Sequence, residues 1–300
     1  MDIRNIGLVG YGEVGKIFGA GLKPQRGVDS VRAWDLKFAN AATADAEMAH
    51  AEAAHIVAEP SMQALCAHAD LVISAVTASN TLAVAQEAAR FIRAGAIFLD
   101  LNSASPGTKQ RAAAAIDGAG AHYVEAGVMT SVPPYGIKVP MLLGGAKAQA
   151  LAQALAGWGM DAKAVSDQLG VASAIKMCRS VMIKGLEALV IESYATARHY
   201  GVEDHVLPTL RETFPSIDWQ QQGAYFFSRV VQHGKRRAEE MREAANTVHE
   251  AGFPPLMAAA IAEKQQWVAD AARAGVFDGL PKGARWQDYA DRLIAARERG

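Results

Sequence analysis

A glycine-rich turn near the start of the chain has the residue types and the spacing of a phosphate-binding site. The GxGxxG cluster follows the apolar residues 6–9 and consists of Gly10, Tyr11, Gly12, Glu13, Val14 and Gly15. The first glycine permits a tight turn, the second lets the backbone approach a pyrophosphate, and the third lets the next helix pack closely on the strand. The N–H groups at the start of that helix, expected near Glu13, then bind the phosphates. The cluster therefore predicts a dinucleotide site, and a tight turn without a ligand is the structural alternative.

An acidic residue after the second predicted strand supports the same interpretation. Asp35 lies twenty residues beyond Gly15, at the end of VRAWD, where its carboxylate can accept hydrogen bonds from the adenosine ribose hydroxyls. That charge would repel a 2′-phosphate, although Lys37 could pair with one. We therefore expect NAD as the cofactor, with NADP as the alternative. Val76 and Thr77, at the end of a further predicted strand, complete the expected cofactor contacts.

Two segments downstream carry groups that could bind a substrate beside the nicotinamide. The first, DLNSASP at residues 100–106, is expected at the carboxyl end of a strand, the edge at which open α/β sheets bind ligands. Asn102 and Ser103 offer short neutral donors and acceptors there. Ser105 has the alternative role of a helix N-cap ahead of Pro106.

The second segment, EAGVMTSVPPYG at residues 125–136, is more apolar than a plain surface linker and contains two adjacent prolines. We expect Met129, Thr130 and Ser131 to contact the substrate, with backbone N–H groups and hydroxyls holding an anionic group. A rigid packed crossover between strands is an equal alternative for the two prolines.

Three polar residues form one stripe on a predicted long helix. Lys176, Ser180 and Lys184 are spaced at i, i+4 and i+8 within a largely apolar sequence. Desolvation lowers the pKa of a lysine, so that its amine can exchange a proton with a substrate hydroxyl. Lys176 is therefore the candidate general acid/base, and Ser180 and Lys184 are candidate substrate contacts. The alternative is that each lysine extends its amine to solvent.

The elements that must position these residues divide the chain into two parts. Short apolar runs alternate with helical stretches up to about residue 165, which predicts βα units around a parallel sheet. We expect strands at residues 3–9, 30–35, 71–76, 96–100, 122–125 and 139–143. The expected fold class is α/β: a doubly wound Rossmann sheet in a cofactor domain at residues 1–166, followed by an all-α domain at residues 167–300.

The second part is expected to be helical and to take part in substrate binding and dimerisation. A long helix at residues 169–200 should stop at Gly201, and further helices are expected at 235–250 and 256–274. The long helix is apolar around most of its circumference, so we expect burial on several sides, between the domains or against a partner subunit. A homodimer is the economical expectation.

Composition narrows the classes of function. The chain has 300 residues, of which 51% are hydrophobic, and a formal net charge of −1. It can bury two cores, and it lacks the positive field that attracts nucleic acid or anionic membranes. No leader pattern or membrane-spanning run is evident, so we expect a cytoplasmic protein with a small-molecule substrate. Cys66 and Cys178 lack disulfide or metal spacing; two buried free thiols and no metal site are expected.

Together these motifs resemble the β-hydroxyacid dehydrogenases, a family that includes 3-hydroxyisobutyrate dehydrogenase and is related to 6-phosphogluconate dehydrogenase. The resemblance covers the first two hundred residues, and it rests on the glycine cluster, DLNSASP, EAGVMTSVPPYG with the following LLGG, and the lysine of GVASAIKMCRS. It implies that Lys176 is the catalytic acid/base. It also implies that Asn102 and Ser103 contact the substrate.

Two departures from the family pattern point to a different substrate. The family usually has Ser-Gly-Gly where this chain has Met129-Thr130-Ser131, and an asparagine where it has Ser180. The substrate implied is therefore not hydroxyisobutyrate. The C-terminal HGKRRAEEMREAA resembles a branch with a domain of unknown function, in which His233, Arg236 and Arg237 could reach a substrate anion. A solvated charged helix face is the alternative for that run.

The sequence thus favours a dehydrogenase that transfers a hydride between NAD(P) and a hydroxy acid or related alcohol or carbonyl compound. An imine reductase or reductive aminase is an alternative, although such enzymes commonly carry an acid or a tyrosine at the position of Lys176. A dinucleotide-sensing protein without turnover is another. A buried lysine counts against the sensor, because its desolvation would have no compensating use.

Overall fold

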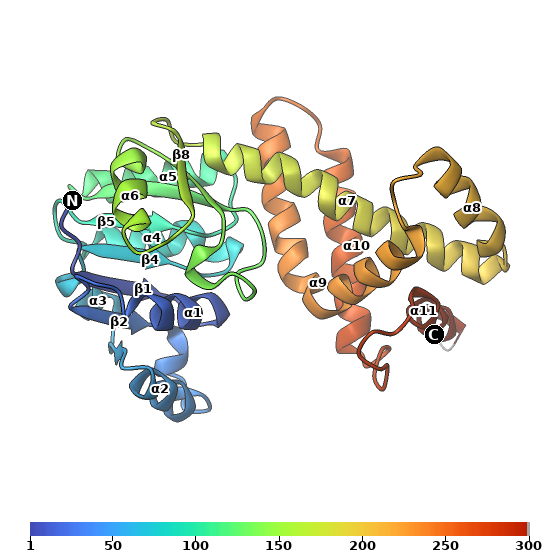
Figure 1. Ribbon diagram of the computed structural model, residues 1–300, viewed down its shortest axis with the longest axis horizontal. Coiled ribbons are helices and arrows are strands. Elements are labelled where there is room, and N and C mark those ends of the chain that lie inside the picture. The colour runs from blue at the N-terminus through green and yellow to red at the C-terminus, as the bar shows by residue number, and fades with distance from the viewer. Residues whose placement is uncertain (299–300) are drawn as a thin grey trace. The chain divides into compact units, whose positions relative to one another are not determined.

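The computed structural model describes residues 1–298, which form two compact units (Figure 1). The first unit ends at Met177 and the second begins at Cys178, inside a long helix. The domain boundary expected at residue 166 falls at the end of the last strand, eleven residues before the end of the first compact unit. Each unit has a hydrophobic core of its own.

The first unit is built on one twisted sheet in the order β3-β2-β1-β4-β5-β6-β7-β8. All neighbouring strands are parallel except β6 and β7, which are antiparallel. The strands are β1 (Asn5–Val9), β2 (Ser30–Trp34), β3 (Val57–Ala58), β4 (Leu71–Ser74), β5 (Ile97–Asp100), β6 (His122–Val128), β7 (Met141–Gly144) and β8 (Ala162–Ser166). The order reverses beside β1, because β2 and β3 lie on one side of it and β4 on the other. The doubly wound Rossmann prediction is confirmed.

Helices cover both faces of this sheet, so the strands are buried on both sides. Alternate strand residues enter two different core clusters, for example Leu8 in one and Val9 in the other. The helices are α1 (Glu13–Leu22), α2 (Ala44–Ala53), α3 (Met62–His68), α4 (Thr81–Ala89), α5 (Pro106–Gly118) and α6 (Ala148–Ala156). Three short 3-10 turns lie between them: η1 (Leu36–Phe38), η2 (Ala78–Asn80) and η3 (Gly136–Lys138).

All six predicted strands are present, with ends that differ by up to three residues. Two strands were not predicted: β3, which is two residues long, and β8, whose AKAVS sequence alternates partly buried and exposed positions. Both lie at the edges of the sheet, where strands are less buried and their sequences therefore show a weaker apolar pattern.

The second unit is helical, as expected. Helix α7 (Val171–Tyr200) begins in the first unit and ends before Gly201, whose φ of +67° explains the stop. It is followed by α8 (Glu203–Thr213), α9 (Trp219–Glu250), α10 (Leu256–Arg273) and α11 (Trp286–Glu298). The core of this unit is rich in aromatic residues, and the rings of Tyr194 and Trp286 meet edge to face at 4.8 Å between centroids. Over the described part of the chain, every helix is too short or too polar to cross a membrane.

One face of α7 remains open in the single chain. Met182 and Leu189 are 66% and 56% exposed, and Ile183 and Leu186 are also exposed. Cys178 lies on the same face and is exposed, so the expectation of two buried thiols is wrong for Cys178 and confirmed only for Cys66. The apolar sequence of α7 predicts burial on several sides, but contacts among the described residues cover only part of its circumference.

Candidate functional site

Strands β1, β4 and β5 end at the same level on the carboxyl edge of the sheet, and β6 passes this level at Glu125 and continues to Val128. Strand pairing aligns Val9 with Ser74, Ser74 with Asp100, and Asp100 with Glu125. Because neighbouring strands lie about 4.8 Å apart, this row extends roughly 14 Å from β1 to β6. β1 and β4 flank the point at which the strand order reverses, where such sheets bind ligands.

The glycine cluster forms a tight turn between β1 and α1. Gly10 has a φ of +93°, and a Cβ on it would lie 2.5 Å from the carbonyl oxygen of Ala75. A Cβ on Gly15 would lie 2.0 Å from the carbonyl oxygen of Gly10, so α1 can begin this close only because residue 15 is glycine. A Cβ on Gly12, by contrast, would meet no atom within 4 Å, and α1 begins there without a side-chain cap. This open space beside uncapped helix N–H groups fits a dinucleotide pyrophosphate.

The remaining two residues of the turn, Glu13 and Val14, belong to the first turn of α1. Glu13 is exposed and Val14 is partly buried against the core under the sheet. A phosphate at this helix start would therefore meet backbone donors of both residues, not the Val14 side chain.

Asp35 is held beside this turn by two backbone N–H groups. The N–H of Tyr11 donates to Oδ2 of Asp35 at 2.6 Å, and the N–H of Lys37 donates to Oδ1 at 2.9 Å. The Tyr11 side chain is fully buried, with its ring 5.5 Å from that of Phe38 and its hydroxyl 3.0 Å from Nδ1 of His50. Each oxygen of Asp35 retains acceptor capacity for a ribose hydroxyl.

Two lysines beside Asp35 share one acidic partner, which sequence reasoning missed. Nζ of Lys16 lies 2.7 Å from Oε2 of Glu47, and Nζ of Lys37 lies 3.5 Å from Oε1. The hydrogen bond from Lys16 lowers the pKa of Glu47, against the opposing effect of burial, and the charge of Lys37 adds to the lowering. Glu47 belongs to α2, whose alanine-rich sequence carries no motif that would indicate which face meets the turn.

Asn102 connects two of the loops at the sheet edge. Its Oδ1 accepts a hydrogen bond from the N–H of Val76 at 2.7 Å, and its Nδ2 donates to Oγ of Ser74 at 3.0 Å. Asn102 is 3% exposed, so its amide serves first to fix the turns after β4 and β5. Thr77 is exposed, and its hydroxyl accepts a hydrogen bond from Nδ2 of Asn80 at 2.8 Å.

A buried ionic cluster adjoins Asn102 and was also missed. Asp100 lies 3.0 Å from Nζ of Lys109, accepts the N–H of Asn102 at 2.8 Å and accepts the hydroxyl of Tyr123. Burial, and then the charge of Asp100, raises the pKa of Tyr123 well above its usual value, so the phenol stays protonated as a donor. The cluster holds the DLNSASP turn rigid from inside.

The other residues of the two substrate segments are more accessible. Ser103 is partly buried, whereas Ser105 accepts the N–H of Thr108 at 3.2 Å, which confirms its alternative role as the N-cap of α5. Met129 and Ser131 are partly buried and Thr130 is exposed. The N–H of Met129 already donates to the carbonyl oxygen of Pro140 at 2.9 Å, so it does not serve as an anion donor.

Glu125 fixes the start of α7. Its Oε1 accepts hydrogen bonds from the N–H groups of Gly170 at 2.8 Å and Ala172 at 3.0 Å, and the side chain is fully buried. A carboxylate at a helix N-terminus also interacts favourably with the helix dipole. A Cβ on Gly144 would lie 2.5 Å from the same Oε1, so the glycine of LLGG makes room for this carboxylate.

Helix α7 lies close to β6 at Lys176 because residue 127 of that strand is glycine. A Cβ on Gly127 would lie 2.9 Å from the carbonyl oxygen of Ala172 and 3.4 Å from Cβ of Lys176. Glu125 pairs with Asp100 of the neighbouring strand. Gly127 and Asn102 each come two residues later, so they lie at the same level of the edge. Lys176 is partly buried there. The first unit thus brings Lys176, Asn102 and the glycine turn to one edge of the sheet.

Ser180 and Lys184 belong to the second unit. Both are 6% exposed; Nζ of Lys184 lies 2.8 Å from Oε2 of Glu240 and 3.3 Å from Oγ of Ser180. The alternative in which Lys184 extends to solvent is therefore wrong, since its amine is buried in an ion pair.

The basic run of α9 divides between exposed and buried positions. His233 and Arg236 are exposed and line a shallow hollow with Lys235 and Arg273. Arg237 is 4% exposed and pairs with the buried Glu187, with Nε 2.9 Å from Oε2. The expectation that Arg237 could reach a substrate anion is therefore wrong. The alternative of a solvated helix face agrees with the exposed His233 and Arg236 and fails at Arg237.

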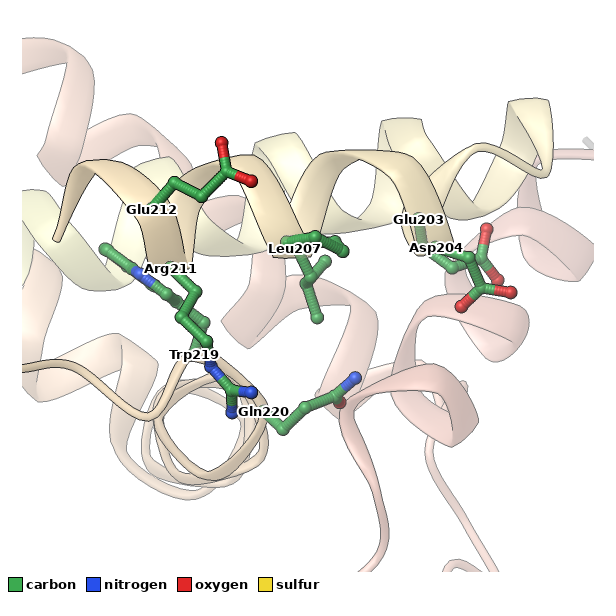
Figure 2. A pocket seen from close by; sticks show the side chains of 8 residues that line it. Glu203, Asp204, Leu207, Arg211, Glu212, Trp219 and Gln220 are labelled. Atoms are coloured by element: carbon green, nitrogen blue, oxygen red, sulfur yellow. The ribbon is translucent and has the colours of Figure 1, made fainter. Parts of the chain in front are cut away.

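A further hollow of about 370 Å³ lies in the second unit, between α8 and the start of α9. Figure 2 shows Leu207 between an acidic end with Glu203 and Asp204 and the other end of α8, where Arg211 extends toward Gln220. None of the residues expected at the active site lines it.

Comparison with known proteins agrees with this geometry. Residues 5–155 match the NAD binding domain of 6-phosphogluconate dehydrogenase, and residues 197–268 match a domain of unknown function, DUF1932. An uncharacterised 28.5 kDa protein of Methanothermus fervidus is 30% identical over 200 residues, which cover 64% of this chain and 73% of that protein. A conserved hypothetical protein of Sinorhizobium meliloti is 37% identical, with a TM-score of 0.77 and coverage of 98% of this chain and 97% of that one.

More distant solved structures share the fold. A 3-hydroxyisobutyrate dehydrogenase of Mycobacterium tuberculosis is 15% identical with a TM-score of 0.64, covering 97% of this chain and 99% of that one. An imine reductase of Streptomyces aurantiacus, at the same coverage, is 17% identical with a TM-score of 0.51. The glycine turn, Asp35 and the strand order thus agree with the family match over half of the sequence: the chain belongs to the family defined by the NAD binding domain of 6-phosphogluconate dehydrogenase, with a C-terminal domain of unknown function.

Proposed function

We propose that the chain is an NAD-dependent dehydrogenase that oxidises a hydroxyl next to, or one carbon from, a carboxylate, or reduces the corresponding carbonyl. The observation that carries the proposal is the close approach of Lys176 to Gly127 at the carboxyl edge of the sheet, where a Cβ added to Gly127 would lie 3.4 Å from Cβ of Lys176. This amine-bearing residue lies on the same edge as the glycine turn, which fits a dinucleotide. A general acid/base and a hydride acceptor on one edge are the two requirements of alcohol oxidation.

Lys176 is the group that moves the proton in this mechanism. The bound cofactor supplies a hydride acceptor at C4 of its nicotinamide. The Lys176 amine accepts the hydroxyl proton as the carbonyl forms, and the resulting ammonium returns that proton when the reaction runs in reverse. Ser103, Thr130 and Ser131 provide hydroxyls at the substrate segments. Asn102 supports the site by fixing the two turns that it joins.

Replacement of the lysine tests the mechanism. Lys176→Ala should keep the affinity for NADH within a few fold and lower turnover by roughly 10² to 10⁴, the range for a lost general acid/base. Lys163→Ala, at an exposed lysine of β8, is the matched control and should retain turnover. Undiminished turnover in Lys176→Ala would remove Lys176 from the mechanism.

A substrate panel separates the dehydrogenase from the other candidates. Absorbance at 340 nm is followed with NAD⁺ and hydroxy acids, and with NADH and aldehydes, keto acids or imines. Turnover of hydroxy acids supports the proposal. Turnover restricted to imines would assign an imine reductase, and NADH binding without any turnover would assign a dinucleotide sensor.

We also propose that the protein is a homodimer. The support is the exposed apolar face of α7 formed by Met182, Ile183, Leu186 and Leu189. A monomer would keep these large apolar side chains in water, at a free-energy cost that increases with the apolar area exposed.

A further inference from the structure

We propose that Glu47 makes the cofactor site selective for NAD(H) over NADP(H), by holding Lys16 and Lys37 in ion pairs that a 2′-phosphate would have to break. The inference rests on the assignment of a nicotinamide dinucleotide site and goes beyond it, because it names the residue that decides between the two cofactors. Selectivity at such sites depends on which charges meet the 2′ position of the adenosine ribose.

The residues concerned surround the end of β2. Asp35 follows β2, Lys37 belongs to η1, Lys16 lies on α1 and Glu47 on α2. Glu47 contacts both lysines, with one carboxylate oxygen directed to each. These four side chains carry two positive and two negative charges, so they present no net positive charge to a phosphate.

Asp35 opposes a 2′-phosphate from a fixed position. Both of its oxygens accept backbone N–H groups, from Tyr11 and Lys37, so the carboxylate cannot turn away without breaking one of these bonds. A phosphate monoester carries a charge of about −1.5 to −2 at pH 7. Its binding would require compensation by the lysines, and the lysines are already paired with Glu47.

Glu47 is itself held in place by the packing of α2. His50, one turn further along α2, contacts the hydroxyl of the buried Tyr11, and the next residue, Ala51, is fully buried. Positions 47, 50 and 51 share one face of a helix, so the contacts that seat α2 on the glycine turn also direct Glu47 toward the lysines. The Glu47 side chain is only 15% exposed, compared with 29% for Lys16 and 45% for Lys37.

Removal of the Glu47 charge should therefore release two cations beside the ribose. The test compares the dissociation constants of NADH and NADPH, measured by cofactor fluorescence at pH 7.5 and low ionic strength. Wild type should bind NADH more tightly. In Glu47→Gln the ratio of the NADPH to the NADH dissociation constant should fall about tenfold, a moderate value because both lysines are partly exposed and screened.

A matched control removes the same charge from the other side of α2. Glu52→Gln lies on the same helix at an exposed position and should leave the ratio within twofold of wild type. Adding Lys37→Met to Glu47→Gln should return the ratio toward the wild-type value. Raising the ionic strength should reduce the effect of Glu47→Gln on this ratio, because the effect depends on charge.

The outcomes separate this inference from the proposed activity, because the measurement is binding and needs no substrate. An unchanged ratio in Glu47→Gln, an equal change in Glu52→Gln, or tighter NADPH binding by wild type would overturn the role of Glu47. Failure of wild type to bind either cofactor would instead refute the dinucleotide site. Thermal unfolding of each variant in the absence of cofactor verifies that the comparison is made between folded proteins.

Discussion

The carboxylate of Glu125, in β6, accepts the backbone N–H of Ala172, in the first turn of α7, at 3.0 Å. Lys176 lies one helical turn beyond Ala172, so the contact sets the distance of Lys176 from the sheet edge. Three glycines permit this arrangement: Gly144 leaves space for the carboxylate, Gly127 lets the helix approach, and Gly170 supplies the other N–H group. The EAG and LLGG motifs thus have a physical role in positioning the lysine.

Removing this carboxylate should affect turnover more than cofactor binding. Glu125→Gln retains an oxygen that can accept both N–H groups and should unfold within a few degrees of wild type. Glu125→Ala leaves two buried N–H groups unpaired, which costs about 2 to 6 kcal/mol of stability. Both variants should bind NADH normally, whereas turnover should decline in Glu125→Ala beyond its loss of folded protein. Equal turnover per folded molecule in both would show that Glu125 only stabilises the fold.

A methyl group at Gly127 tests the close approach directly. In Gly127→Ala the new Cβ would lie 2.9 Å from the carbonyl oxygen of Ala172, so α7 must move away from β6. We expect turnover to fall by roughly 10²-fold, as for a small displacement of a catalytic group, while NADH affinity stays within a few fold. Gly118→Ala, where a Cβ meets no atom within 4 Å, is the control and should be neutral or slightly stabilising. Wild-type turnover in Gly127→Ala would mean that the spacing is not required.

The parts of the site that follow from local sequence were predictable. Gly10 and Gly15 are required by contacts within a few residues along the chain or with the adjacent strand, and the apolar run before them identifies β1. Asp35 was predictable because it comes directly after the second strand, twenty residues beyond Gly15. The apolar length of α7 and its end before Gly201 are equally local features.

Residues that act through long-range packing were not predictable in the same way. Glu47 and His50 meet the glycine turn only because α2 rotates one face toward Tyr11, and nothing in its alanine-rich sequence marks that face. Lys184 is buried because Glu240, on another helix, neutralises it. Cys178 is exposed for the converse reason, since none of the elements described in residues 1–298 buries its side chain.

Asp70 should give the first unit a dependence on acid pH. Burial opposes the ionised form of Asp70, but the N–H groups of Asn5 and Arg4 and the guanidinium of Arg93 outweigh it and lower the pKa. Because the pKa of Asp70 is lower in the folded protein than in the unfolded chain, where it is near 3.8, the ionised carboxylate stabilises the fold at pH values above 3.8. This stabilisation disappears as the pH falls through the pKa of the folded state.

Asp70→Asn should therefore lower the thermal midpoint at pH 6 to 7, and the difference from wild type should shrink as the pH decreases below 4. Circular dichroism melts between pH 3 and pH 7 measure this. Asp161→Asn, at an exposed position of the same unit, should follow the wild-type profile throughout. A difference between Asp70→Asn and wild type that is constant with pH would show that the charge of Asp70 is not the cause.

The open face of α7 links the association of the protein to the reactivity of its Cys178 thiol. Cys178 and Leu189 are eleven positions apart, close to three helical turns, so both lie on the face proposed to meet a second copy. Leu189→Glu should convert a dimer into a monomer in sedimentation experiments. Leu36→Glu, at a leucine that is 75% exposed in the first unit, should not.

Labelling with a disulfide reagent at pH 8 should then be faster at Cys178 in Leu189→Glu than in wild type, because dissociation uncovers the thiol. Cys66 should remain slow in both proteins, since burial, followed by the nearby charge of Glu87, raises its pKa to about 12. A wild-type protein that sediments as a monomer, with Cys178 labelled as fast as in the variant, would contradict the dimer and leave this apolar face solvated.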